Sequence, residues 1–103
     1  VMRHSERVDH SFKNWIGLSN KQGRYTPYDK NMPASLPIDR PLPDYSLDTP
    51  ITRNGLVLAE MVGLHLRQRV ADVIYVNPSL RCLQTAHAVK RMSGSVARLR
   101  IEP

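Results

Sequence analysis

The sequence predicts an α/β fold in which a mainly parallel sheet packs against helices. Residues 73–76 form an apolar, β-branched run of the kind found in buried strands. Segments with the apolar spacing of helices lie on both sides of this run. The resulting order is strand, long loop, helix, strand, helix, strand, and it is typical of a parallel sheet with helices across its faces.

In the first half of the chain, we expect the end of a strand followed by a long insert. Val1 and Met2 pass straight into polar residues, as at the end of a strand. The insert, at about residues 8–50, holds six of the eight prolines, so we expect no long helix or central strand there, only a helical turn around 12–18. The insert must nevertheless be ordered, because it carries large side chains that need packing partners, namely Phe12, Trp15, Ile16, Tyr25, Tyr28 and Tyr45.

The second half predicts two helices and two strands. Thr52 can cap a helix whose apolar positions are Leu56, Ala59, Val62, Gly63 and Leu66. A strand is expected over Asp72–Val76, and Asn77 and Pro78 would then provide the N-cap and first position of a helix over Leu80–Met92. Gly94 ends that helix, and Ala97–Ile101 alternates as a further strand.

Length and composition exclude several classes of protein. The 103 residues suffice for one small domain, and no apolar run is long enough to span a bilayer. The single cysteine excludes an internal disulfide framework and a cysteine-based zinc site, and it is consistent with a reducing compartment. Charge at the very start excludes a signal peptide, so we expect a cytoplasmic protein.

The charge pattern excludes further partners. Lys and Arg number 15 against 9 Asp and Glu, but they form no stripe interleaved with aromatic residues, so we expect no nucleic acid and no membrane as partner. No metal-ligand spacing of histidines and acids occurs, so we expect neither a metal nor another cofactor.

The candidate catalytic segment is Arg3-His4-Ser5-Glu6-Arg7. It lies at the expected carboxyl end of the first strand, the edge at which open α/β sheets bind ligands. Two guanidinium groups can clamp phosphate oxygens, and a neutral imidazole can attack phosphorus. The alternative for a lone histidine near arginines is a structural or exposed position.

A second candidate, Arg81, lies in the first turn of the helix after the buried strand. A helix start offers free N–H groups to an anion but is an unfavourable place for a cation. Arg81 therefore indicates an anionic ligand nearby.

Together, the segments 3–9, 50–52 and 77–86 resemble the histidine phosphatase superfamily (phosphoglycerate-mutase-like). The finer pattern is similar to the branch of the suppressor-of-T-cell-receptor-signalling (Sts) phosphatases and the insect ecdysteroid-phosphate phosphatases. The resemblance implies a three-layer αβα fold, of which residues 1–103 would be the N-terminal part. It also implies a phosphatase with His4 as the nucleophile, through a phosphohistidine intermediate, and with Arg3, Arg7 and Arg81 around the phosphate.

Two departures from the family pattern leave a second hypothesis open. Ser5 stands beside the expected pocket where the family almost always has glycine, and the family's proton donor and second catalytic histidine belong to a segment after Glu102-Pro103. The alternative is therefore a catalytically silent phosphate-binding or regulatory relative, or an inactive fragment. A basic binder of nucleic acid or anionic surfaces ranks last.

Further expectations concern the pocket and the partners. His10 is a candidate for the pocket wall, with an exposed loop position as the alternative. The phosphorylated substrate would be a phosphotyrosyl protein or a small phosphate ester. The apolar helix faces need a cover from further chain or from a second copy, so a homodimer stays open.

Overall fold

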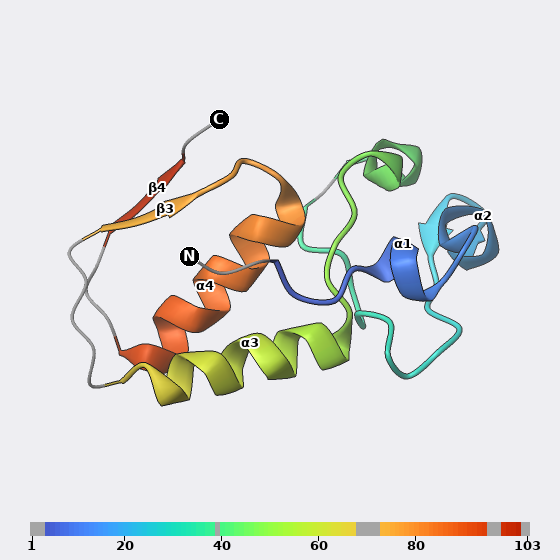
Figure 1. Cartoon of the computed structure of the whole chain (residues 1–103). Coiled ribbons are helices and arrows are strands. Elements are labelled where there is room, and N and C mark those ends of the chain that lie inside the picture. The colour runs from blue at the N-terminus through green and yellow to red at the C-terminus, as the bar shows by residue number, and fades with distance from the viewer. Residues whose placement is uncertain (1–3, 39, 68–72, 95–97, 102–103) are drawn as a thin grey trace.

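Two long helices pack along each other on the side of the molecule opposite the insert (Figure 1). They are α3, Arg53–His65, and α4, Leu80–Ser93. The computed structural model describes residues 4–38, 40–67, 73–94 and 98–101. The strand end expected at Val1 and Met2 lies outside these residues.

A parallel pair of strands lies beside α4. The strands are β3, Val73–Val76, and β4, Arg98–Ile101, with Val73 opposite Arg98. α4 joins the two strands and contacts both β3 and α3, so sheet and helices are stacked as in an α/β fold (Figure 1). The predicted fold class is confirmed, and so are both strands within the described residues.

Small residues form the buried side of α3. Gly55, Ala59 and Gly63 are buried at intervals of one helical turn, and Ala59 and Gly63 lie against α4. A Cβ added at Gly63 would lie 2.7 Å from the carbonyl oxygen of Val89, so the helix backbones approach closely there. This corrects the prediction for Leu56 and Val62, which were expected on the buried face and are 39% and 41% exposed. The close approach moves large side chains to the flanks of the contact.

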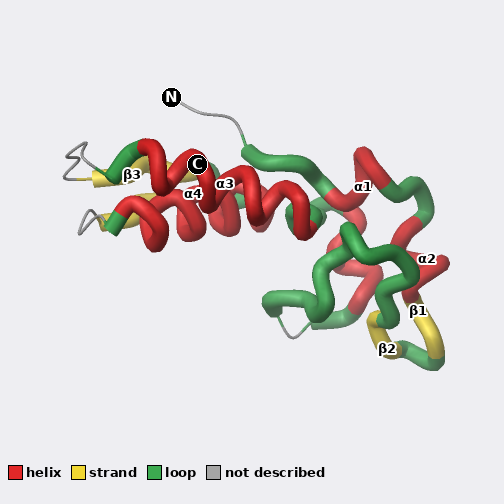
Figure 2. Tube along the Cα trace, turned by 90° about the horizontal axis from the view of Figure 1, so that it is seen from below, coloured by secondary structure: helices red, strands yellow, loops and turns green. Residues whose placement is uncertain are grey.

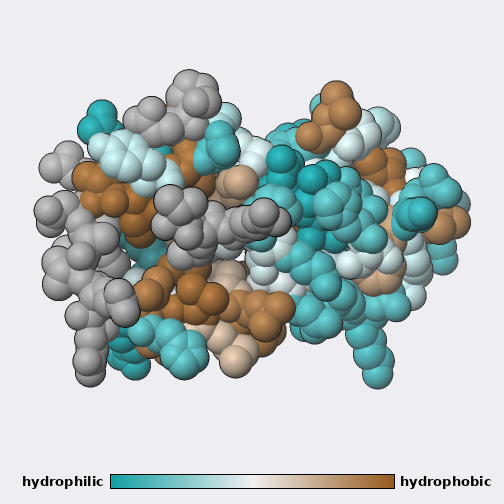
Figure 3. Space-filling model, viewed as in Figure 1, coloured by the Kyte–Doolittle hydropathy of each residue, from teal (hydrophilic) through white to brown (hydrophobic). Residues whose placement is uncertain are grey.

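The opposite side of α3 presents an apolar surface. Its large exposed side chains are about half accessible and include Val57, Leu58, Met61 and Leu64. Figure 3 shows hydrophobic surface where α3 runs along the molecule. A cover for this face, by further chain or by a second copy, stays a prediction.

The two helices begin differently. The side chain of Thr52 accepts a hydrogen bond from the Gly55 N–H (3.0 Å), which confirms the predicted cap of α3. The predicted start of α4 at Leu80 is confirmed, but the predicted cap is wrong, because the N-cap residue is Ser79 rather than Asn77 and its side chain makes no capping bond.

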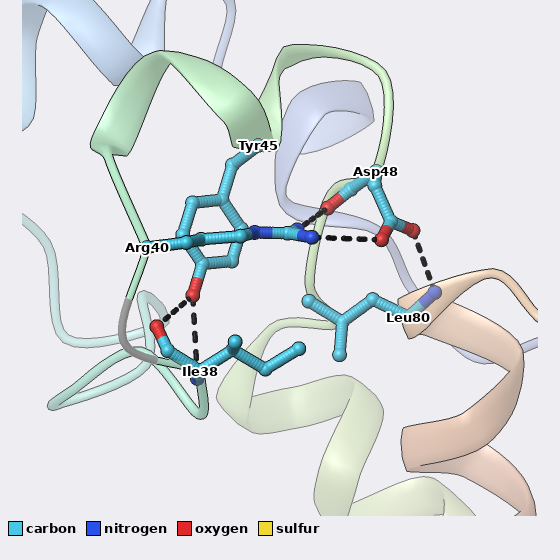
Figure 4. A network of polar contacts seen from close by, with 5 residues as sticks. All are labelled: Ile38, Arg40, Tyr45, Asp48 and Leu80. Atoms are coloured by element: carbon cyan, nitrogen blue, oxygen red, sulfur yellow. Dashed lines mark hydrogen bonds and ion pairs between the residues drawn. The ribbon is translucent and has the colours of Figure 1, made fainter.

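The first N–H of α4 is bound by the insert instead. The carboxylate of Asp48 accepts from the Leu80 N–H (2.6 Å) and pairs with the Arg40 guanidinium (3.2 Å; Figure 4). That guanidinium also lies 4.0 Å from the centre of the Tyr45 ring. Asp48 thus supplies a negative charge at the start of α4, where the helix N–H groups attract an anion.

The insert folds around a core of its own, beyond the first turn of α3 (Figure 2). Its elements are the helices α1, Val8–Ser11, and α2, Trp15–Ser19, the hairpin strands β1, Asn20–Lys21, and β2, Arg24–Tyr25, and the 3₁₀ helix η1, Leu42–Ser46. The one helical turn expected around 12–18 is replaced by α1 and α2, because Asn14 between them is left-handed (φ 59°). The buried core residues are Val8, Trp15, Met32, Leu42, Tyr45 and Leu80.

A methyl group at position 63 should push the two helices apart. Gly63→Ala should lower the free energy of unfolding by about 1–3 kcal/mol, because its Cβ meets the backbone of Val89. Gly17→Ala in α2 is the matched control, since nothing lies within 4 Å of a Cβ there. Helix propensity alone favours alanine at both positions by up to about 1 kcal/mol. Equal effects of the two substitutions in denaturant unfolding would contradict the close packing.

Candidate active site

The segment His4–Glu6 runs between the N-terminal halves of the two long helices. The Ser5 N–H donates to Thr85 Oγ1 (2.8 Å), and the same hydroxyl donates to the Arg81 carbonyl (2.8 Å). On the other side, the Ser5 hydroxyl donates to the Gly55 carbonyl (2.5 Å). Backbone and side chain of Ser5 therefore fasten the predicted catalytic segment to α4 and α3 at once.

His4 is held in one orientation by its neighbour. Its half-buried ring places Nδ1 2.8 Å from the carbonyl oxygen of Ser5. A carbonyl oxygen only accepts hydrogen bonds, so Nδ1 carries the proton in this contact. The lone pair of the neutral ring is then on Nε2, the atom available for attack on an electrophile.

Glu6 ties this segment to α3. Its carboxylate accepts from the Thr52 hydroxyl (2.5 Å) and from the Asn31 amide (2.9 Å). The hydrogen bond from Thr52, and next the one from Asn31, hold the pKa of Glu6 below its ordinary value. The Glu6 carbonyl also accepts from the Thr52 N–H (2.8 Å), so main chain and side chain of Glu6 both bind the start of α3.

Asn31 completes the start of α3 from within the insert. Its backbone carbonyl accepts from the Arg53 N–H (2.9 Å), and its side-chain oxygen accepts from the Asn54 N–H (2.8 Å). With Thr52 bound to Gly55, the first three N–H groups of the helix all have partners. Neither Asn31 nor the role of Glu6 is predicted from the sequence. Glu6 at least belongs to the recognised segment, whereas nothing local marks Asn31.

The predicted phosphate ligands differ in their surroundings. The Arg7 guanidinium forms a two-point pair with Asp9, with Nε–Oδ1 at 2.9 Å and Nη2–Oδ2 at 2.6 Å. Arg81 is the second residue of α4, and its buried Nε has no hydrogen-bond partner. Arg3 lies outside the described residues. Arg81 is thus the candidate ligand with an unused buried donor.

The positions of the remaining candidate residues say less about the site. His10 is exposed on α1, and its role in a pocket stays a prediction. Cys82 is a half-buried free thiol. In the part of the chain that the structure describes, no group of three or more His, Cys, Asp and Glu side chains is placed to hold a metal ion. Likewise, none of the described helices has the length and apolarity of a membrane span.

Comparison with known proteins identifies the family. Residues 44–103 match the sequence profile of the histidine phosphatase superfamily, branch 1. The chain belongs to this superfamily. The histidine phosphatase match begins within η1 and covers both long helices and both parallel strands.

Named relatives place the chain within the Sts and ecdysteroid-phosphate phosphatase branch. It is 40% identical over 110 residues to ubiquitin-associated and SH3 domain-containing protein B of Mus musculus, covering 100% of this chain and 17% of the relative. It is 39% identical over 89 residues to the ecdysteroid-phosphate phosphatase of Drosophila melanogaster, covering 82% of this chain and 12% of that protein. The chain therefore spans less than a fifth of these curated relatives.

A solved structure shares the fold. The crystal structure of the ecdysone phosphate phosphatase of Bombyx mori in complex with tungstate superimposes with a TM-score of 0.89 at 31% identity. The match covers 98% of this chain and 41% of that one. The predicted phosphoglycerate-mutase-like fold of a histidine phosphatase is confirmed by this likeness.

Removing the Asn31 side chain should weaken the junction between the insert and α3. Asn31→Ala loses the bonds to Glu6 and to the Asn54 N–H, and should lower the free energy of unfolding by about 1–2 kcal/mol. Asn31→Asp keeps an acceptor for Asn54 but cannot donate to Glu6, so it separates the two contributions. Asn20→Ala is the control, because Asn20 binds only the Gly23 N–H of an exposed hairpin (2.9 Å). An effect of Asn31→Ala no larger than that of Asn20→Ala in denaturant unfolding would refute this role.

Proposed function

We propose that this chain provides the nucleophile and part of the phosphate site of a phosphomonoesterase that acts through a phosphohistidine on His4. The observation that carries the proposal is the bond from Nδ1 of His4 to the Ser5 carbonyl, which leaves Nε2 as the nucleophilic atom. The names of the ecdysteroid-phosphate phosphatase relatives support the same reaction class. So does the tungstate complex of the Bombyx mori protein, since tungstate is an oxyanion of phosphate-like shape.

The reaction would proceed in two transfers. The lone pair of Nε2 attacks phosphorus, the Nε2–P bond forms and the ester P–O bond breaks. The leaving oxygen takes a proton from an acid that the family resemblance places after Glu102-Pro103. Water then attacks phosphorus, the Nε2–P bond breaks, and inorganic phosphate leaves as the water gives up a proton.

Arg81 would stabilise the charge on the transferred group. Its Nε is buried without a partner, and the N-terminal end of α4 adds positive potential beside it. Thr85 links this turn to Ser5 through the hydroxyl that accepts from the Ser5 N–H and donates to the Arg81 carbonyl. Nucleophile and cation are thus fixed to the same helix.

Two observations favour a second candidate, a phosphate-binding relative without turnover. Asp9 occupies two donors of the Arg7 guanidinium, so Arg7 offers fewer hydrogen bonds to phosphate than a free arginine would. Ser5 also carries a side chain where the resembling family has glycine. Such a relative would bind orthophosphate and release no product from an ester.

Hydrolysis of p-nitrophenyl phosphate by the full-length gene product tests the proposal. His4→Ala should lower kcat at least about a thousand-fold, because no other group replaces the nucleophile. His87→Ala, at an exposed position of α4, should leave the rate unchanged. Brief reaction with labelled substrate should also leave an acid-labile, alkali-stable phosphoprotein that the His4→Ala variant does not form.

The two candidate functions predict different results. Hydrolysis that survives His4→Ala would overturn the mechanism. Binding of orthophosphate with no hydrolysis by the unsubstituted protein would favour the silent relative instead.

A further inference from the structure

A surface hollow lies beside the predicted catalytic segment and takes no part in the proposed phosphoryl transfer. It has a volume of about 420 Å³ and is lined by residues within 27–34 and by Arg53, the first residue of α3. One hydrogen bond links its rim to the catalytic segment, since Asn31, between the lining residues Lys30 and Met32, donates to Glu6 (2.9 Å). Asn31 thereby connects the rim of the hollow to Glu6, two residues after His4.

The hollow is held in shape by its own contacts. Met32 is only 1% exposed, and its sulfur accepts from the Tyr28 N–H (3.5 Å). The Tyr28 ring packs edge-on against Phe12, with ring centres 6.0 Å apart. The Met32 N–H donates to the Asp29 carbonyl (3.1 Å), which closes the turn between the two. These contacts fix the turn at residues 28–32, with the half-exposed Tyr28 ring at the edge of the hollow.

The rim carries an excess of unpaired positive charge. Lys30 and Arg53 are exposed, and within the described residues neither side chain has an ion pair. The acid of the lining, Asp29, already accepts from the Asn31 N–H (2.8 Å) through Oδ1. With the Asp29 carboxylate counted, the lining keeps one positive charge in excess, which suits an anionic group.

The open rim favours an extended ligand over an enclosed one. Small-molecule sites usually bury most of their ligand, whereas Tyr28 is 46% exposed and both cations face solvent. A peptide can cross such a rim with one acidic side chain at the cations and its phosphorylated residue at His4.

We propose that Lys30 and Arg53 form an accessory subsite for an acidic side chain of a phosphorylated peptide substrate. The inference rests on the proposed phosphatase function, and it makes that function selective for acidic sequences. It also gives the insert a role in substrate choice in addition to its bonds to α3.

The subsite is tested with two phosphotyrosyl peptides that differ only in their flanking residues. One peptide has acidic flanking residues, and the other has the matching amides. Affinities for the full-length gene product are measured by fluorescence anisotropy, and kcat/KM is measured with the same peptides. Lys30→Ala and Arg53→Ala should each reduce the preference for the acidic peptide about three-fold, and the double variant about ten-fold, as expected for exposed charge pairs. Neither change should alter binding of the neutral peptide or hydrolysis of p-nitrophenyl phosphate.

A matched control removes the same charge elsewhere. Lys13 and Arg24 are exposed on the insert and do not line the hollow, so the Lys13→Ala/Arg24→Ala variant should keep the full preference. Equal preferences in the Lys30→Ala/Arg53→Ala variant and in the unsubstituted protein would overturn the subsite. An equal loss of the acidic preference in the Lys13→Ala/Arg24→Ala variant would also overturn it.

The binding measurement separates the two proposals. Loss of the acidic preference in binding, with no hydrolysis of any ester, would support the subsite and refute the phosphatase. Hydrolysis of p-nitrophenyl phosphate with no preference for the acidic peptide would support the phosphatase and refute the subsite.

Discussion

Residues 5 and 6 pass so close to the first turn of α3 that no side chain fits at position 55. A Cβ on Gly55 would lie 2.8 Å from the Glu6 carbonyl oxygen and 3.2 Å from Ser5 Oγ. This approach lets the Ser5 hydroxyl reach the Gly55 carbonyl and lets Glu6 bind Thr52. This close contact on the α3 side, together with the bond from the Ser5 N–H to Thr85 on the α4 side, holds His4 between the two helices.

The insert acts on both long helices through their unpaired N–H groups. Asn31 binds two of them at the start of α3, and Asp48 binds the first one of α4. Arg40 and the buried Tyr45 fix Asp48 in turn, through the ion pair and the stacked guanidinium (Figure 4). A proline-rich segment with little regular structure therefore sets where the two helices begin, and with them the geometry around His4.

Local sequence patterns predict the helices and strands whose hydrogen bonds join neighbouring residues. They do not predict hydrogen bonds between residues that are far apart in the sequence. The strands, the extents of both long helices and the Thr52 cap follow from periodicity and from bonds within one turn. The cap of α4 is not predicted correctly, because the first N–H of this helix, that of Leu80, is bound by Asp48, 32 positions earlier. The bond between Asn31 and Glu6 spans 25 positions, and no local pattern encodes it. The family resemblance predicts the site residues, but their hydrogen bonds are visible only in the folded chain.

The central claim is that the fold presents Nε2 of His4 as the nucleophile, and long-range ¹H–¹⁵N correlation spectra of the labelled protein test it most directly. The His4 ring is assigned by its absence from the spectrum of His4→Ala, and the exposed His87 serves as an internal reference. We predict that the neutral His4 ring carries its proton on Nδ1, because that nitrogen faces the Ser5 carbonyl at 2.8 Å. A neutral His4 ring with its proton on Nε2 would contradict the account.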